Sequence, residues 1–230
     1  MTVASRLQEA RSRVDEAAQA AGHLVTLVAV TKTVPLEEIR RAYEAGQRVF
    51  GENRVQEGAA KAAALAGEQP GAEWHLIGHL QSNKARRAVE VFTTISSVDS
   101  ERLAQKLNDQ AELVARTLPV LLEINVSEEE SKSGLTIEQF WDAIPRLLQL
   151  PHLEIQGLMT IAPQVANPDD ARPVFRRLRE LRDEVRDRLP LSGFNELSMG
   201  MSNDYLVAID EGATMVRLGR AIFGERLARH

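Results

Sequence analysis

Cysteine is absent from this chain of 230 residues, and lysine is scarce, with five lysines against 23 arginines. The absence of cysteine excludes a disulfide framework, cysteine-ligated zinc, an iron–sulfur cluster and a thiol nucleophile. The net charge of -5 argues against a broadly basic nucleic-acid surface. No stretch approaches the roughly 20 apolar residues of a membrane span, and the N-terminus lacks the apolar region of a signal peptide. We therefore expect a soluble, cytoplasmic protein with neither nucleic acid nor membrane as a partner.

Short apolar runs alternate with helical patterns along the whole chain. Such alternation predicts a parallel sheet, and eight units in a chain of this length predict a single (β/α)8 TIM barrel with an extra N-terminal helix, one domain over residues 1–230. A doubly wound open sheet is the rival, but the first strand–helix turn lacks the G-x-G-x-x-G pattern. The strands are expected at 24–30, 48–50, 74–77, 91–96, 118–124, 153–158, 194–197 and 214–218.

The helices are expected in the intervals between these strands. The first, over 3–21, carries an apolar stripe at helical spacing, and Thr136 and Gln139 have the spacing of a capping box at the start of another. The remaining helices are expected at 35–45, 53–65, 82–90, 99–115, 136–150, 168–189 and 202–211, with a last one after the eighth strand.

Lys32 closes the apolar run LVTLVAVTK and shares one strand face with Val28 and Val30. Active sites of such barrels lie where the strands end, so an inward lysine here would be partly desolvated. Desolvation lowers the pKa of an amine and makes its neutral, nucleophilic form available. The alternative is a lysine that extends to solvent, but in so arginine-rich a chain a plain surface cation would more often be arginine.

Two loops suggest a phosphate site. The segment from Ser198 to Ser202 (SMGMS) follows the expected seventh strand, and Arg217-Leu218-Gly219-Arg220 follows the eighth. Barrels often bind phosphate with these two loops, through backbone N–H groups near glycines and helix starts. Together with Lys32, this arrangement suits a phosphorylated aldehyde held as a Schiff base, either pyridoxal phosphate or a sugar phosphate.

Two other patterns carry little functional weight. His75 and His79 are four residues apart, but they flank a glycine and no nearby cysteine or carboxylate completes a metal-binding set. The arginine-rich helix beginning near 172 interleaves acids, with Arg176–Glu180, Arg179–Asp183 and Glu184–Arg188 at i,i+4 spacing and Val174, Leu178, Leu181 and Val185 as its buried stripe. We expect no metal site, and a solvated helix face with those ion pairs.

Seven motifs in order resemble the pyridoxal phosphate homeostasis protein family, also called the proline synthase co-transcribed family. They run from the first strand to the last: LVAVTKTVP, FGENRVQE, WHLIGHLQSNK, INVSEEESKSGL, GLMT, LSMGMSND and MVRLGRAIFG. The resemblance implies a fold similar to the N-terminal barrel of alanine racemase and pyridoxal phosphate as the cofactor.

The resemblance also implies which residues bind the cofactor. Lys32 matches the lysine that holds it as an internal aldimine, Arg217 would face the pyridine nitrogen, and Asn53 would lie beside the ring. Ser198 and Gly219, with the neighbouring N–H groups of Met199, Gly200 and Arg220, would hold the phosphate. Lys84 and Lys132 fall in family motifs without an assigned role, whereas Lys61 and Lys106 are expected to be surface cations.

The resemblance implies a carrier and regulator of cellular pyridoxal phosphate rather than an enzyme, with pyridoxal-phosphate-dependent apo-enzymes as candidate recipients. No coiled-coil or large apolar surface pattern requires an oligomer, so we expect a monomer. The chain ends soon after the eighth strand, and neither Tyr43 nor Tyr205 is an obvious second base. No residue is therefore predicted to be catalytic. A weak amino acid racemase and a cofactor-free Schiff-base aldolase remain the alternatives.

Overall fold

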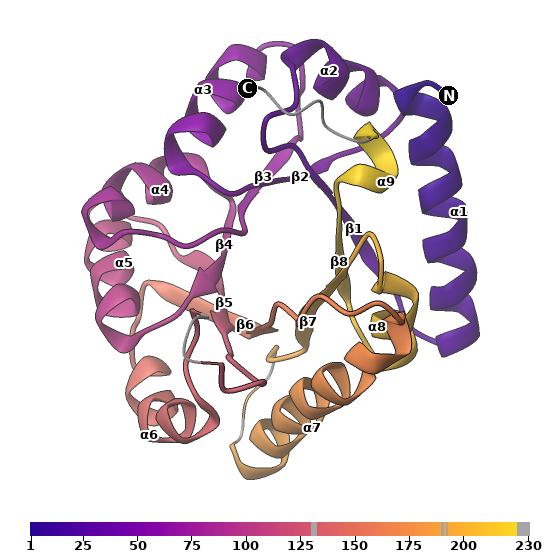
Figure 1. Cartoon of the computed structure of the whole chain (residues 1–230). Helices are drawn as coiled ribbons and strands as arrows, with labels where there is room; N and C mark the ends of the chain where they lie inside the picture. Colours follow the sequence, from indigo (N-terminus) through magenta and orange to yellow (C-terminus); the bar gives the residue numbers. More distant parts are fainter. Residues whose placement is uncertain (130–132, 190, 192, 225–230) are drawn as a thin grey trace.

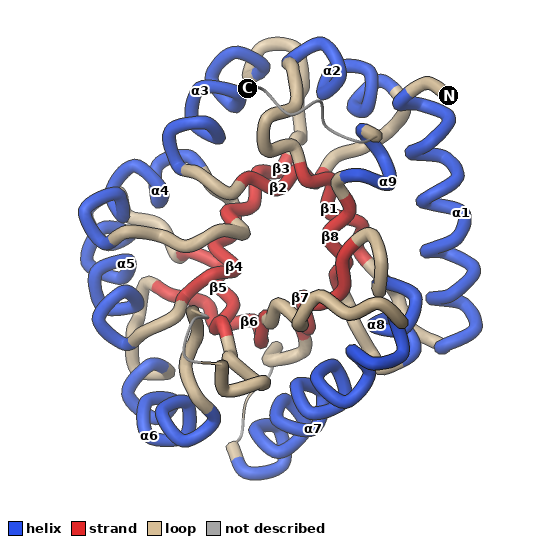
Figure 2. The backbone as a smooth tube through the Cα atoms, viewed as in Figure 1, coloured by secondary structure: helices blue, strands red, loops and turns tan. Residues whose placement is uncertain are grey.

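The computed structural model describes residues 1–129, 133–189, 191 and 193–224. Its eight strands are parallel and close into a barrel in which β1 pairs with β8 (Figures 1 and 2), so the predicted (β/α)8 fold is confirmed. The strands are β1 Thr26–Val30, β2 Val49–Glu52, β3 Glu73–Leu76, β4 Thr94–Val98, β5 Leu118–Glu123, β6 Leu153–Met159, β7 Glu196–Met201 and β8 Met215–Leu218.

The helices form the outer ring, and the extra N-terminal helix is present. It packs against α8 and α9 (Figure 1) and buries Val3, Leu7, Ala10 and Val14, as its apolar stripe predicts. No described helix combines the length and apolarity needed to cross a membrane. The helices are α1 Val3–Ala21, α2 Leu36–Glu44, α3 Val55–Leu65, α4 Ala85–Val91, α5 Glu101–Leu113, α6 Ile137–Leu147, α7 Arg172–Arg188, α8 Tyr205–Asp210 and α9 Arg220–Phe223, with the short 3-10 turns η1 Ser82–Lys84 and η2 Pro168–Ala171.

The inside of the barrel is apolar and then becomes charged toward the carboxyl ends of the strands. Leu121, Met159 and Met215 form a small buried cluster, separate from the main core between strands and helices. Because side chains alternate along a strand, residues two further on share the same face. Glu123 of β5 and Arg217 of β8 therefore face the barrel interior just above this apolar layer.

Strand β7 differs from its prediction and changes the geometry of one candidate loop. It covers Glu196–Met201 rather than 194–197, so Ser198, Met199 and Gly200 belong to the strand and not to the loop after it. Phe194 is buried without being part of the strand, and the alternation of LSMGM continues the strand beyond Leu197. Gly200 has φ +89 and lies against Ala208 of α8.

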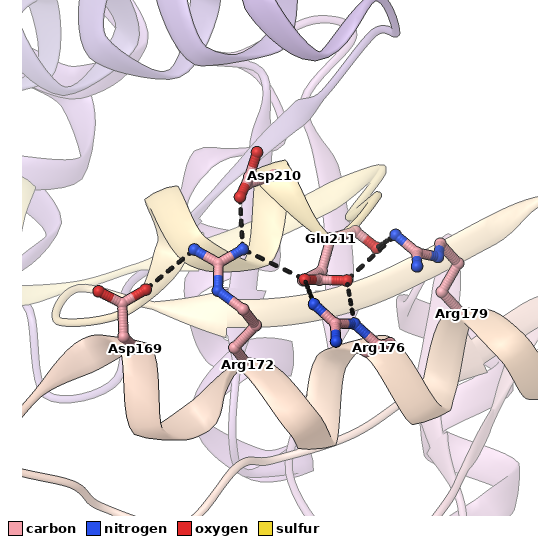
Figure 3. A network of polar contacts seen from close by, with 6 residues as sticks. All are labelled: Asp169, Arg172, Arg176, Arg179, Asp210 and Glu211. Atoms are coloured by element: carbon pink, nitrogen blue, oxygen red, sulfur yellow. Dashed lines mark hydrogen bonds and ion pairs between the residues drawn. The ribbon is translucent and has the colours of Figure 1, made fainter.

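The arginines of α7 make different ion pairs from those predicted (Figure 3). Arg176 and Arg179 do not pair along the helix but contact the buried carboxylate of Glu211, at 2.8 and 3.1 Å. Arg172 joins the same carboxylate at 3.1 Å and also contacts Asp210. Of the predicted pairs, Glu184–Arg188 is present, at 3.7 Å. The spacing rule failed because Glu211, after the end of α8, lies closer to these arginines than the acids on α7.

The buried stripe of α7 also differs from its prediction at one position. Phe175, and not Val174, is buried together with Leu178, Leu181 and Val185. Phe175 is fully buried and has the larger apolar side chain, so more apolar surface leaves water when it faces the barrel.

Candidate functional site

A cavity of about 400 Å³ lies at the carboxyl ends of the strands. This is the end at which barrel proteins place their active sites, and the volume lies within the range of small-molecule pockets. Its lining comes from the ends of β1, β7 and β8 and from the segments that follow β1, β2, β3, β6, β7 and β8: Val30, Lys32, Asn53, Ile77, Ile161, Pro163, Gln164, Val165, Pro168, Met201, Ser202, Asn203, Asp204, Arg217, Gly219 and Arg220.

The cavity brings together most of the residues that the sequence suggested. Lys32, Asn53, Arg217, Gly219 and Arg220 all line it. The three candidates from β7 are not among the lining residues and are all buried: Ser198, Met199 and Gly200. The end of β7 and the segment after it take their place at the cavity wall, with Met201, Ser202, Asn203 and Asp204.

Ser198 is tied to the cavity through Arg217. The Nη1 of Arg217 donates to both the carbonyl and the Oγ of Ser198 at 2.7 Å, and its Nη2 donates to the carbonyl of Thr160 at 2.8 Å. Burial lowers the pKa of the Arg217 guanidinium to about 10, and the nearby Glu123 and Asp204 oppose this effect. Arg217 therefore keeps its positive charge at neutral pH while its direction is fixed by β6 and β7.

The polar lining suits an anionic ligand. Lys32, Arg217 and Arg220 contribute cations to the wall, and Asp204 contributes the carboxylate. Burial raises the pKa of Asp204, although its Oδ1 accepts a 2.6 Å hydrogen bond from the Met201 N–H. The resulting excess of positive charge attracts phosphate or carboxylate groups.

Further hydrogen-bonding groups of the cavity wall add to its polar lining. The Arg220 guanidinium donates to the Asn203 side chain at 3.2 Å, and the Ser202 hydroxyl lies 3.5 Å from the N–H of Ala221 in the first turn of α9. The Oδ1 of Asn53 is buried and has no hydrogen-bond partner in the described part of the chain. A buried polar atom of this kind is costly, so a ligand that donates to it would be favoured.

A second cavity of about 210 Å³ shares Asn53, Ile77 and Ile161 with the first. Glu123, His79, Asn125 and Ser133 add polar groups to its wall, and His79 Nδ1 lies 2.8 Å from an Asp99 oxygen. Burial, together with the charge of Asp99, raises the pKa of Glu123 to about 7.

Sequence reasoning overlooked Glu123. The signal that could have found it is the strand LPVLLE, in which a carboxylate ends an apolar run on the same face as Leu121.

Lys61 is not the surface cation that its helical position suggested. It is buried, and its Nζ donates to the Thr31 carbonyl at 2.6 Å and to carboxylate oxygens of Glu52 and Glu57 at 2.7 Å each. The prediction was wrong because Glu52, at the end of β2, lies beside α3 and draws the ammonium inward. Lys106 is exposed on α5, as predicted.

The remaining lysines stand apart from this cavity. Lys84 is half-buried in η1 and is not among the residues lining either cavity, and Lys132 lies outside the described residues. Within residues 1–129, 133–189, 191 and 193–224, no three histidine or carboxylate side chains are grouped closely enough to hold a metal ion.

The family model described as "Alanine racemase, N-terminal domain" matches residues 5–227. The pyridoxal phosphate homeostasis protein of Aquifex aeolicus (strain VF5) is 42% identical over 229 residues, which cover 98% of this chain and 99% of that protein. The protein of the same name from Synechocystis sp. is 48% identical over 203 residues, or 88% and 92% of the two chains. The structure of PipY from Synechococcus elongatus PCC7942, with PLP bound, is 41% identical with a TM-score of 0.87, and covers 97% of this chain and 100% of that one.

Proposed function

Because the chain belongs to the pyridoxal phosphate homeostasis protein family, which carries the N-terminal barrel of alanine racemase, we propose that it binds pyridoxal 5'-phosphate covalently at Lys32 Nζ and serves cellular homeostasis of this cofactor. The observation that carries the proposal is one cavity that holds a lysine amine, a buried guanidinium and a second cationic side chain, those of Lys32, Arg217 and Arg220. When bound, pyridoxal phosphate supplies an aldehyde that condenses reversibly with a primary amine and releases water.

The phosphate is proposed to bind between the segments after β7 and β8. Ser202, Gly219 and Arg220 line the cavity there, and the Ser202 hydroxyl is close to the first turn of α9. Ser198, Met199 and Gly200, which the motif resemblance assigns to the phosphate, would contribute from within β7 by supporting this segment and by fixing Arg217.

Arg217 is proposed to face the ring nitrogen of the cofactor. Its Nη1 and Nη2 donate to Ser198 and Thr160, whereas its Nε makes no hydrogen bond with the described residues. A guanidinium that stays protonated would donate a hydrogen bond to the ring nitrogen, and its positive charge would disfavour protonation of that nitrogen, which weakens the ring as an electron sink. Such a site suits holding the cofactor more than amino acid chemistry.

We also propose that the protein does not catalyse a reaction of amino acids. A racemase needs a second base opposite its lysine, but neither tyrosine lines the cavity: Tyr43 donates to the Pro70 carbonyl at 2.8 Å, and Tyr205 is buried under Arg13. Incubating the loaded protein with amino acids deuterated at the α-carbon tests this part. We expect no exchange beyond that caused by free pyridoxal phosphate, and faster exchange would favour a weak racemase.

Reduction with borohydride followed by peptide mapping tests the proposed attachment. We expect the reduced cofactor on the peptide that contains Lys32. Its recovery only on peptides with Lys84 or Lys132 would refute the assignment. A protein that takes up no pyridoxal phosphate but is trapped with a sugar phosphate would favour the aldolase.

A further inference from the structure

The backbone on both sides of Lys32 is bound by one buried ion-pair network. On one side, the Thr31 carbonyl accepts a 2.6 Å hydrogen bond from Lys61 Nζ. On the other, the Thr33 N–H donates to Glu57 Oε1 at 2.6 Å, and Glu57 Oε1 in turn accepts from Lys61 Nζ at 2.7 Å. The ammonium of Lys61 is therefore linked to the residue before Lys32 and to the residue after it.

Thr33 needs this support because of its backbone conformation. Its φ is +61, in the left-handed region that β-branched residues rarely adopt. Such outliers persist when the surrounding structure fixes them, and they concentrate at functional sites. The left-handed residue comes directly after Lys32, so it bends the chain away from β1 immediately beyond the lysine.

The ammonium of Lys61 can bind all of its buried acceptors at once. Three acceptors, the Thr31 carbonyl and one oxygen each from Glu52 and Glu57, meet at its Nζ at 2.6–2.7 Å. An ammonium offers three donors from one atom, so all three acceptors are satisfied. The same oxygen of Glu52, Oε1, also accepts a hydrogen bond from the Thr31 hydroxyl at 2.6 Å.

We propose that Lys61 is a positioning residue for Lys32, and that its ammonium holds Thr31 and Thr33 so that the Lys32 side chain, in the turn after β1, extends toward the cavity. The role rests on the proposed attachment of pyridoxal phosphate at Lys32. Lys61 does not line the cavity and acts only through the backbone of its neighbours.

The Lys61→Met variant tests the proposal, with the exposed Lys106→Met as its matched control. Amide hydrogen exchange of Thr33, measured by NMR without added cofactor, should speed up about tenfold in Lys61→Met and stay unchanged in the control. The apparent affinity for pyridoxal phosphate should fall about fivefold to thirtyfold, the factor that corresponds to losing support for one left-handed residue.

A second substitution separates positioning from general stability. Asparagine adopts the left-handed region more readily than threonine does, so adding Thr33→Asn should recover most of the lost affinity of Lys61→Met. If Lys61→Met does not fold, Glu57→Gln replaces it, because the Glu57 side chain is 26% exposed and its loss is milder. Affinity that stays low after Thr33→Asn would overturn the proposal.

The proposal would also be overturned by a folded Lys61→Met or Glu57→Gln variant in which two properties match the wild type. These are the rate of amide hydrogen exchange at Thr33 and the affinity for pyridoxal phosphate. Failure of the wild-type protein to bind pyridoxal phosphate would instead refute the proposed function. The exchange of Thr33 in the cofactor-free variants would still decide whether Lys61 fixes this backbone.

Discussion

The guanidinium of Arg217 and the side chain of Ser198 meet at 2.7 Å inside the barrel, and a second bond of the same length reaches the Ser198 carbonyl. With the further bond to the Thr160 carbonyl, Arg217 of β8 is joined to β7 and to the residue that follows β6. A residue taken from the sequence as a cofactor contact is therefore also a structural crosslink.

Replacing Arg217 with methionine should destabilise the protein. The Thr160 and Ser198 groups would lose their donor in a buried place, which costs about 1–3 kcal/mol. Urea unfolding at pH 7 measures the change, and Arg220→Met is the control. Arg220 is exposed and donates to Asn203, so its replacement should shift the free energy of unfolding by less than about 0.5 kcal/mol. Equal effects of the two substitutions would contradict the crosslinking role.

Glu123 should make stability depend on pH. Burial raises its pKa in the folded protein to about 7, whereas an unfolded glutamate titrates near 4.3. The folded state then binds the extra proton between these values, so stability falls as pH rises through this window and levels off above about 7. Glu123→Gln removes the effect, and its stability relative to the wild type should grow by about 1–3 kcal/mol from pH 4.5 to pH 8.

Urea unfolding across this pH range checks the prediction for Glu123, with exposed Glu112→Gln as the comparison. The difference between Glu123→Gln and the wild type should change with pH by more than the difference between Glu112→Gln and the wild type. A constant difference for Glu123→Gln would show that the pKa of the Glu123 carboxyl is not raised in the folded protein.

Gly200→Ala should disturb the wall of the cavity. A Cβ at this position would lie 2.6 Å from the Ala208 Cβ and 3.0 Å from the Tyr205 Cα, and φ is +89. Strain and overpacking together should cost about 2–4 kcal/mol. Gly22→Ala, at φ +75 with open space around it, isolates the dihedral cost of about 1 kcal/mol. Thermal unfolding distinguishes the two, and a Gly200→Ala protein no less stable than Gly22→Ala would argue against close packing of β7 on α8.

Glu211 should contribute more to the stability of the fold than its neighbour Asp210, although both contact Arg172 (Figure 3). Hydrogen bonds from Arg176, followed by those from Arg172, lower the pKa of Glu211, so the carboxylate stabilises the fold above its unfolded pKa and loses this effect as pH falls. Glu211→Gln should cost about 1–3 kcal/mol at pH 7, with the loss shrinking below about pH 4. Asp210→Asn, at a 65% exposed side chain, should cost less than about 1 kcal/mol. Chemical denaturation at both pH values is the measurement, and a loss that persists unchanged in acid would contradict the ion-pair account.

The sequence predicted the barrel because its signals are local and repeated. The stripe on 3–21 and the capping box of Thr136 and Gln139 both appear in the structure where their spacing places them. Lys32, at the end of an apolar strand, likewise lines the cavity. Each of these features depends on residues that are close together in the chain.

The features that the sequence did not predict depend on contacts between distant segments. Lys61 is buried because it binds Glu52 and Thr31, which lie outside α3. The helical spacing of residues on α3 cannot predict contacts with residues outside that helix. The pairing of Arg176 and Arg179 with Glu211 has the same origin. The extent of β7 was missed because Phe194, which is buried outside the strand, has the apolar character of a strand residue.

The absorption spectrum of the purified protein with pyridoxal phosphate, recorded for the wild type and for Lys32→Ala, decides whether the cofactor is attached at Lys32. Lys106→Ala, which removes an exposed amine, is the control. We expect the band of the covalently attached cofactor in the wild type and in the control, and its loss in Lys32→Ala. Retention of that band in Lys32→Ala, or no band in the wild type, would refute covalent attachment at Lys32.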